Sequence, residues 1–192
     1  MNDLIKELRE LTGSGMLEVK NALTEAGGDK EKALEILRKK GATKFGKKAD
    51  RIANEGIVES YIHPGGRVGV LLELNCETDF VARTEDFKAL AKDIALHIAA
   101  TNPLYVSSQE VPMEVVEKEK EIYKEQLKGK SEDMMAKILD GKITKYYEEA
   151  CLLEQAFVKN TEIKIKDVLG QAVSKLGENV VVKRFARFVL GN

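Results

Sequence analysis

The sequence predicts an α+β protein in which a three-helix N-terminal bundle precedes a three-stranded antiparallel sheet covered by helices, with a helical hairpin. Three observations predict this class. Apolar residues recur at helical spacing at the start of the chain, two β-branched runs flank a glycine-rich turn, and a third β-branched run stands near the end. Helices grouped beside antiparallel strands are typical of an α+β core.

The N-terminal segment predicts three short helices. The first is interrupted at residues 12–15. The second ends at Gly27 and Gly28, which suit a left-handed helix cap. Asp29 caps the third helix, and Gly41 is expected to end it. Their apolar stripes are Leu4, Ile5, Leu8 and Leu11; Met16, Val19, Ala22 and Leu23; and Ala33, Leu34 and Leu37.

Residues 38–51 predict a basic linker, with seven basic residues against one acidic residue. We expect a solvated, mobile connection, and contact with phosphate or RNA is the alternative. The chain then divides into residues 1–52, the bundle with its linker, and residues 53–192, the α+β core. Residues 41–48 also match G-x-x-x-x-G-K. However, Lys48 stands where a phosphate-binding loop needs Ser or Thr, and a helix precedes the motif, so we expect no nucleotide site there.

The core is predicted as a succession of strands and helices. The second member of the helical hairpin is expected to begin at Ser131 and to be interrupted at Gly141, and Gly129 is expected to end the first. Helical periodicity continues to residue 158. The elements are strands at 56–62 and 68–74 around the turn 63–67, a helix at 84–100, the hairpin helices at 113–128 and 131–150, a helix at 165–176, and a strand at 180–189.

Composition argues against several classes of protein. The 192 residues carry a net charge of −1, contain no apolar run long enough to span a membrane, and begin without a signal-peptide pattern, so we expect a cytoplasmic location. Cys76 and Cys151 have no metal-ligand spacing, which favours two buried free thiols over a metal site. We find no arrangement typical of covalent catalysis, so we expect neither an enzyme nor a cofactor.

The stretch Thr78-Asp79-Phe80 lies between the second predicted strand and the helix that follows it. A carboxylate beside a large aromatic in such a connection suits contact with a partner protein. The alternative is that Asp79 caps a turn while Phe80 covers the end of the strand. The residues alone leave both interpretations open.

Residues 73–83, ELNCETDFVAR, closely resemble the signature of bacterial-type elongation factor Ts. The resemblance implies a non-covalent guanine-nucleotide exchange factor that promotes GDP release from elongation factor Tu in protein synthesis. It also implies that Thr78, Asp79 and Phe80, together with Val81, enter the partner near its Mg²⁺ and nucleotide site. The segment ALHIAA resembles the family's helix that approaches the partner's phosphate-binding loop, which makes His97 a candidate contact.

Residues 8–41 also resemble the start of this family, through LRELTGSGM and KNALTEAGGDKEKALEILRKKG. The resemblance implies a ubiquitin-associated-like bundle that grips the partner's GTP-binding domain. The candidate contacts in this bundle are Thr12, Gly13, Gly15 and Met16. The competing interpretation is an RNA- or ribosome-associated adaptor that uses the basic linker, and its binding would depend steeply on salt.

Longer members of the family carry a second copy of the core half, whereas this chain resembles the short forms with one copy. We therefore expect a homodimer, with the helices at 113–128 and 131–150 as candidate contacts. The family commonly has Pro where Ala156 stands, so the geometry of that loop is not implied by the resemblance.

Overall fold

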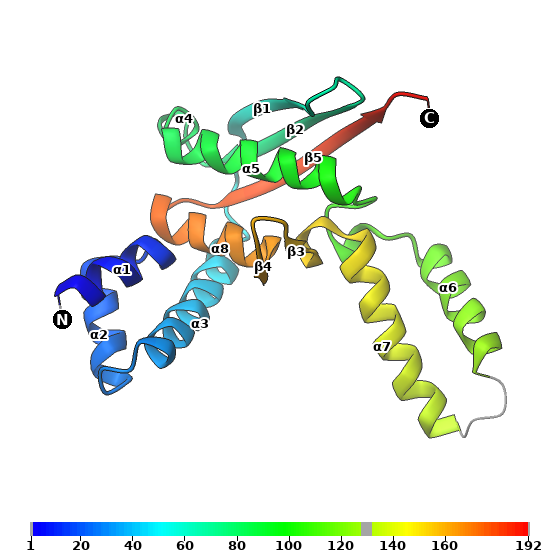
Figure 1. Ribbon diagram of the computed structural model, residues 1–192, viewed down its shortest axis with the longest axis horizontal. Helices are drawn as coiled ribbons and strands as arrows, with labels where there is room; N and C mark the ends of the chain where they lie inside the picture. The colour runs from blue at the N-terminus through cyan, green and yellow to red at the C-terminus, as the bar shows by residue number, and fades with distance from the viewer. Residues whose placement is uncertain (1, 128–131, 192) are drawn as a thin grey trace. The chain divides into compact units, whose positions relative to one another are not determined.

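The computed structural model describes residues 2–127 and 132–191 and divides into two compact units. One unit is Met1–Ala99 with Lys166–Asn192, and the other is Ala100–Ile165. The described residues form eight α-helices, two short 3-10 helices and five strands (Figure 1). The mixture of helices with a three-stranded antiparallel sheet confirms the predicted fold class.

The N-terminal segment forms three helices, α1 (Asn2–Thr12), α2 (Met16–Glu25) and α3 (Lys30–Lys48). Most residues of their predicted apolar stripes meet in one core, whereas Leu11 and Met16, which were also placed on these stripes, are exposed. The buried residues of this core are Ile5, Leu8, Val19, Ala22, Leu23, Ala33 and Leu37. Burial of these side chains holds the three helices together, because helices of this length are marginal by themselves in water.

The caps between α2 and α3 are those that the sequence predicts. Gly27 and Gly28 both have positive φ, and the Gly28 N–H donates to the Leu23 carbonyl at 2.8 Å. The Asp29 carboxylate then accepts from the backbone N–H of Glu31 at 2.9 Å and of Lys32 at 3.1 Å. These bonds satisfy helix-end groups that would otherwise lack partners.

The prediction that Gly41 ends the third helix is wrong. α3 continues to Lys48, so most of the predicted basic linker is helical. Gly41 does not have the positive φ of a helix-ending glycine. A glycine inside a helix costs only about 1 kcal/mol relative to alanine, which the helix tolerates. The motif at 41–48 therefore lies within a helix and has none of the strand–loop–helix context of a phosphate-binding loop.

The central sheet has the predicted topology. Its strands are β1 (Glu55–Ile62), β2 (Val68–Cys76) and β5 (Val180–Val189), all antiparallel in the order β1-β2-β5. The turn between β1 and β2 uses Gly65 and Gly66 at positive φ. A bulge opposite Glu73 and Leu74 shifts the register of β5.

One face of this sheet is buried, as the alternation of side chains along β2 requires. Figure 1 shows α5 (Glu85–Thr101) running across the sheet, and α8 (Ile165–Leu176) leads into β5. The buried apolar side chains of the sheet and of these helices include Val70, Leu72, Leu74, Cys76, Val180 and Val182 from the strands, Phe87, Ala91, Ile94, Ala95 and Ile98 from α5, and Leu169 and Val173 from α8. Gly177, with φ +81°, follows the last residue of α8, whose bounds are those of the predicted helix at 165–176.

The second unit contains the helical hairpin, formed by α6 (Met113–Gln126) and α7 (Glu132–Ala150). The predicted interruption at Gly141 is wrong, because α7 passes through it. The predicted boundaries at Gly129 and Ser131 lie outside the described residues. Val111, Ala150 and Cys151 form a small core near the end of α7.

The predicted helical periodicity beyond residue 150 is also wrong. The Ala150 carbonyl accepts from the N–H groups of Leu104 and Tyr105 at 2.8 and 3.1 Å, and Tyr105 forms a parallel bridge with Cys151. This long-range pairing ends the helix where local periodicity would continue it. The chain goes on through the 3-10 helix Leu152–Glu154 and the short antiparallel pair β3 (Ala156–Phe157) and β4 (Asn160–Lys164); another 3-10 helix, Ser108–Glu110, precedes α6.

Candidate partner-binding site

The stretch Thr78-Asp79-Phe80 forms the start of a one-turn helix, α4 (Asp79–Ala82), with Thr78 as its N-cap residue. The Phe80 side chain is 79% exposed, whereas Ala82 on the same turn is buried. Val81 lies half-buried between them. Because its ring protrudes, the alternative in which Phe80 covers the end of the strand is wrong. We call residues 78–81 the tip.

The Asp79 carboxylate lies at the surface of the tip. It pairs with the guanidinium of Arg83, one helical turn later, at 2.7 Å. Exposed ion pairs of this kind contribute about 0.3–0.5 kcal/mol, so this pair can be broken at low cost. Asp79 is therefore held loosely by its own helix and is available to charges outside it.

The base of the tip is held by Glu178, which stands 100 residues further along the chain. One carboxylate oxygen of Glu178 accepts from the N–H groups of Glu77 at 3.1 Å and Thr78 at 3.0 Å. The other oxygen accepts from the Thr78 hydroxyl at 2.6 Å. In return, the Glu77 carboxylate accepts from the backbone N–H of Asn179 at 2.7 Å.

Sequence reasoning missed Glu178. The signal that would have found it is the strand register, because Cys76 pairs with Val180 in the antiparallel ladder. That pairing brings the residues just after β2 beside those just before β5.

Cys76 ends β2 directly beneath the tip and is fully buried as a free thiol, as predicted. Its thiol donates to the Thr78 carbonyl at 3.1 Å. Burial raises the pKa of the Cys76 thiol to about 11, and the nearby Glu178 carboxylate adds to this rise. The sulfur is therefore protonated near neutral pH and serves as a donor to the tip.

The four candidate contacts in the N-terminal bundle separate into two kinds. Thr12 is 5% exposed, and its hydroxyl donates to the Leu8 carbonyl at 2.6 Å. Gly13 has φ +65°, which is a conformation that glycine adopts without strain. These two residues shape the turn between α1 and α2 rather than present side chains.

The beginning of α2 is more accessible. Gly15 is the exposed N-cap residue of α2, and its N–H donates to the Glu18 carboxylate at 3.3 Å. Met16 is 54% exposed, and its neighbour Leu17, which sequence reasoning missed, is 71% exposed. Adjacent exposed apolar side chains on a rigid helix start are suited to contact with another protein.

His97 is placed differently from the other candidates. It lies in the middle of α5 and has no exposed surface. A lone histidine on a helix is usually exposed or half-buried, and His97 departs from that usual pattern. Contact between His97 and a partner requires a rearrangement of the packing around α5, and it stays a prediction.

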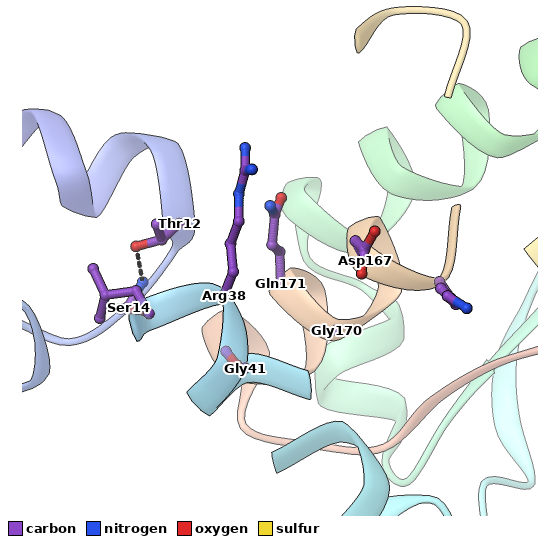
Figure 2. Close-up of a pocket in the computed structure, with 10 residues that line it drawn as sticks. Thr12, Ser14, Arg38, Gly41, Asp167, Gly170 and Gln171 are labelled. Atoms are coloured by element: carbon purple, nitrogen blue, oxygen red, sulfur yellow. Dashed lines mark hydrogen bonds between the residues drawn. The ribbon is translucent and has the colours of Figure 1, made fainter. Parts of the chain in front are cut away.

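A cavity of about 150 Å³ lies between the N-terminal bundle and α8. Figure 2 shows Thr12 and Ser14 on one side and Gln171 and Asp167 on the other, with the dashed bond joining the Ser14 N–H to the Thr12 hydroxyl. The remaining lining residues are Leu37, Arg38, Gly41, Lys166, Gly170 and Ser174. The tip residues do not line this cavity, so the cavity and the tip are separate features.

Residues 16–192 match the model of a family of translation elongation factors. The description of that family is elongation factor TS, and the chain belongs to it. The family resemblance of residues 73–83 is thereby confirmed.

Curated relatives cover nearly the whole chain. The elongation factor Ts of Fervidobacterium nodosum is 57% identical over 190 residues, which are 98% of this chain and 96% of the relative. That of Carboxydothermus hydrogenoformans is 54% identical over 99% of this chain and 88% of the relative. That of Thermotoga maritima is 55% identical over 98% of this chain and 95% of the relative.

In the part of the chain that the structure describes, no helix has both the length and the apolar character needed to cross a membrane.

Proposed function

We propose that this chain promotes the release of GDP from elongation factor Tu as a non-covalent guanine-nucleotide exchange factor, by inserting its tip near the partner's nucleotide and Mg²⁺. The observation that carries the proposal is the 79% exposure of Phe80 on a one-turn helix whose base is clamped. Family membership in translation elongation supports the choice of partner.

An exchange factor works by binding the nucleotide-free partner more tightly than the nucleotide-bound one. By linkage, the factor by which it lowers nucleotide affinity equals the factor by which nucleotide lowers its own affinity. A hundredfold effect corresponds to about 2.7 kcal/mol of coupling. Complete burial of a phenylalanine side chain contributes about 1.5–3 kcal/mol, so Phe80 entering an apolar slot has the required magnitude.

Asp79 contributes through its charge. A bound Mg²⁺ is the largest local charge in a nucleotide site, so a carboxylate brought beside it changes the energies of its ligands. To act in this way, Asp79 gives up its exposed ion pair with Arg83, which costs little.

The N-terminal bundle supplies a second contact in this proposal. It acts as a ubiquitin-associated-like unit that grips the partner's GTP-binding domain, with the exposed Met16 and Leu17 at the centre of the contact. Residues 1–52 would then bind the partner, while residues 53–192 carry the tip and the surface for self-association.

Self-association as a homodimer is the remaining part of the proposal. The sheet face opposite α5 carries exposed apolar side chains, which we call the open face: Val58, Ile62, Leu71, Phe188 and Leu190. Ile62, Leu71, Phe188 and Leu190 line one shallow depression. Because these side chains are contiguous, the open face suits a twofold contact better than the helices expected from the sequence, where Met134 and Ile122 are exposed on α7 and α6.

The test is release of fluorescent GDP from elongation factor Tu, followed in a stopped-flow instrument with and without this protein. Release accelerated in proportion to the added protein, until the partner saturates, is the expected result. An unchanged rate would overturn the exchange function. Salt-dependent RNA binding that is lost on neutralising the charges at 38–51 would then favour the adaptor.

A further inference from the structure

The turn between α8 and β5, residues 177–179, contacts two parts of the chain that are distant in sequence. Glu178 accepts three hydrogen bonds from Glu77 and Thr78 at the base of the tip. Asn179 donates to the carbonyl oxygens of Ala49 at 3.3 Å and Arg51 at 2.8 Å, just after α3 ends. The Lys48 ammonium, in the last turn of α3, donates to the Gly177 carbonyl.

We propose that Glu178 is a positioning residue for nucleotide exchange: it orients Phe80 through Thr78, and its turn links the tip to the chain that leaves the N-terminal bundle. This inference rests on the proposed function, because Phe80 has to be presented to a partner for its orientation to matter.

The tip needs an external support because α4 is too short to hold itself. Forming a single helical turn costs the conformational entropy of several backbone dihedrals, and few hydrogen bonds offset that cost. A one-turn helix is therefore unstable by itself. An N-cap threonine ordinarily accepts a hydrogen bond from a backbone N–H inside its own helix. In the described structure, the Thr78 side chain accepts no hydrogen bond from the backbone of α4. Its hydroxyl donates to the Glu178 carboxylate instead.

The contacts of Glu178 suit this role in strength and in direction. Hydrogen bonds to an ionised carboxylate are roughly twice as strong as neutral ones. Three donors converge on the two oxygens of the Glu178 carboxylate. The carboxylate therefore fixes both the direction of the backbone at Thr78 and the distance between Thr78 and Glu178. Phe80 follows two residues later, and its orientation therefore depends on Glu178.

The reciprocal bonds make the turn and the tip one unit. Glu77 accepts from the Asn179 N–H at 2.7 Å and lies 3.5 Å from the Arg51 guanidinium. A displacement of residues 49–51 therefore bears on the tip through Asn179 and Glu77. This connection is the physical route by which docking of the bundle can bias the tip.

The first experiment compares stimulated GDP release at saturating factor for four variants. Glu178→Ala and Thr78→Val are expected to slow release at least about tenfold, because each removes charge-assisted hydrogen bonds to the base of the tip. Thr78→Ser keeps the hydroxyl and is expected to restore release to within about twofold of the parent. Glu85→Gln is the matched control, since Glu85 is an exposed carboxylate near the tip that pairs with Lys88 one helical turn away.

The second experiment measures the stability of the tip by amide hydrogen exchange in the absence of any partner. Hydrogen exchange of the Ala82, Arg83 and Thr84 amides, which bond to Thr78, Asp79 and Val81, is expected to accelerate in Glu178→Ala and Thr78→Val while the amides of β2 stay protected. Parent-like exchange of these amides in both variants would overturn the positioning role, whatever the release assay shows. If the parent protein fails to stimulate release, the proposed function fails, and the amide measurement still decides whether Glu178 orders the tip.

Two further comparisons test the positioning role of Glu178. The double variant Glu178→Ala/Thr78→Val should release GDP no more slowly than the slower of the two single variants, because the bond that Thr78→Val removes is already lost in Glu178→Ala. Additive losses would contradict this. If Glu178→Ala does not fold, the contrast between Thr78→Val and Thr78→Ser decides alone, and equal release by these two overturns the proposal.

Discussion

The side-chain amide of Asn179 donates to the backbone carbonyl of Arg51 at 2.8 Å, across 128 positions of the sequence. Asn179 is 1% exposed, and it also bonds to the Ala49 carbonyl. The Asn75 amide similarly donates to the Ala53 carbonyl at 3.2 Å. The segment predicted as a mobile linker is therefore partly helix, up to Lys48, and partly a connection held by buried amides.

Replacing Asn179 by alanine is expected to lower the free energy of unfolding by about 1–3 kcal/mol, because it removes the buried donors to two carbonyl groups. Urea denaturation of both proteins measures the difference. Asn54→Ala, at an exposed asparagine of the same connection, is the matched control and is expected to stay within about 0.5 kcal/mol. Equal stability of the Asn179 and Asn54 variants would show that the amide contacts do not hold the connection.

Residues 53–192 alone are expected to stay folded and to bind elongation factor Tu more weakly than the full chain. The core of the bundle is formed by its own residues, so its removal leaves the sheet core intact. Asn179 loses its acceptors but gains water, which limits the cost. Circular dichroism and titration against the partner measure the two properties. A fragment that is unfolded, or one that binds at full affinity, would contradict the predicted division at residue 52.

Phe80→Ala is expected to slow stimulated GDP release at least about tenfold while the protein keeps its melting temperature. A ring that is 79% exposed contributes little packing, so the loss of about 3–5 kcal/mol typical of buried phenylalanines does not apply. Asp79→Ala is expected to slow release less, because the neighbouring ring remains. Stopped-flow release at saturating factor, paired with a thermal melt, separates the two effects. Parent-like release from well-folded Phe80→Ala would exclude insertion of the Phe80 ring as the cause of exchange.

The two buried thiols predict a pH dependence. Burial raises the pKa of both Cys76 and Cys151 to about 11, so the folded state holds their protons more tightly than the unfolded chain does. Their contribution to stability is present in full below about pH 9 and is lost as the pH rises through about 11. Urea denaturation at a series of pH values is expected to show a steeper alkaline fall for the parent than for Cys76→Ala/Cys151→Ala. An equal alkaline fall in unfolding free energy for the two proteins would contradict the raised pKa values of the thiols.

Phe188→Asp is expected to shift the protein from dimer to monomer in sedimentation at micromolar concentration, because it places a charge in the open face. Phe188 is 65% exposed in the single chain, so the folded monomer should persist. Met134→Asp, at an exposed methionine of α7, is the comparison. Loss of the dimer in Met134→Asp but not in Phe188→Asp would favour the helices expected from the sequence as the dimer contact. A parent protein that sediments as a monomer would exclude both surfaces as dimer contacts.

Local patterns in the sequence determined much of this fold. The bounds of α8 and β5 agree with the prediction, and the caps at Gly28, Asp29 and Gly177 lie where their residue types require them. Each of these features depends on neighbours within a few residues, which is the range that periodicity and capping report. The position of Phe80 between a strand and a helical stripe was predicted in the same way, whereas the exposure of its ring was left open by the residues alone.

The tertiary structure alone decided the features that depend on distant partners. Helical periodicity past residue 150 is overridden because Leu104 and Tyr105 take the Ala150 carbonyl, and no local rule foresees that pairing. The burial of His97 follows from the packing around α5 rather than from its residue type. Glu178 reads in sequence as a solvated acidic residue, and it meets Thr78 only because Cys76 and Val180 are paired in the sheet. A one-turn helix takes its orientation from such a contact, since it has too few hydrogen bonds of its own to hold one.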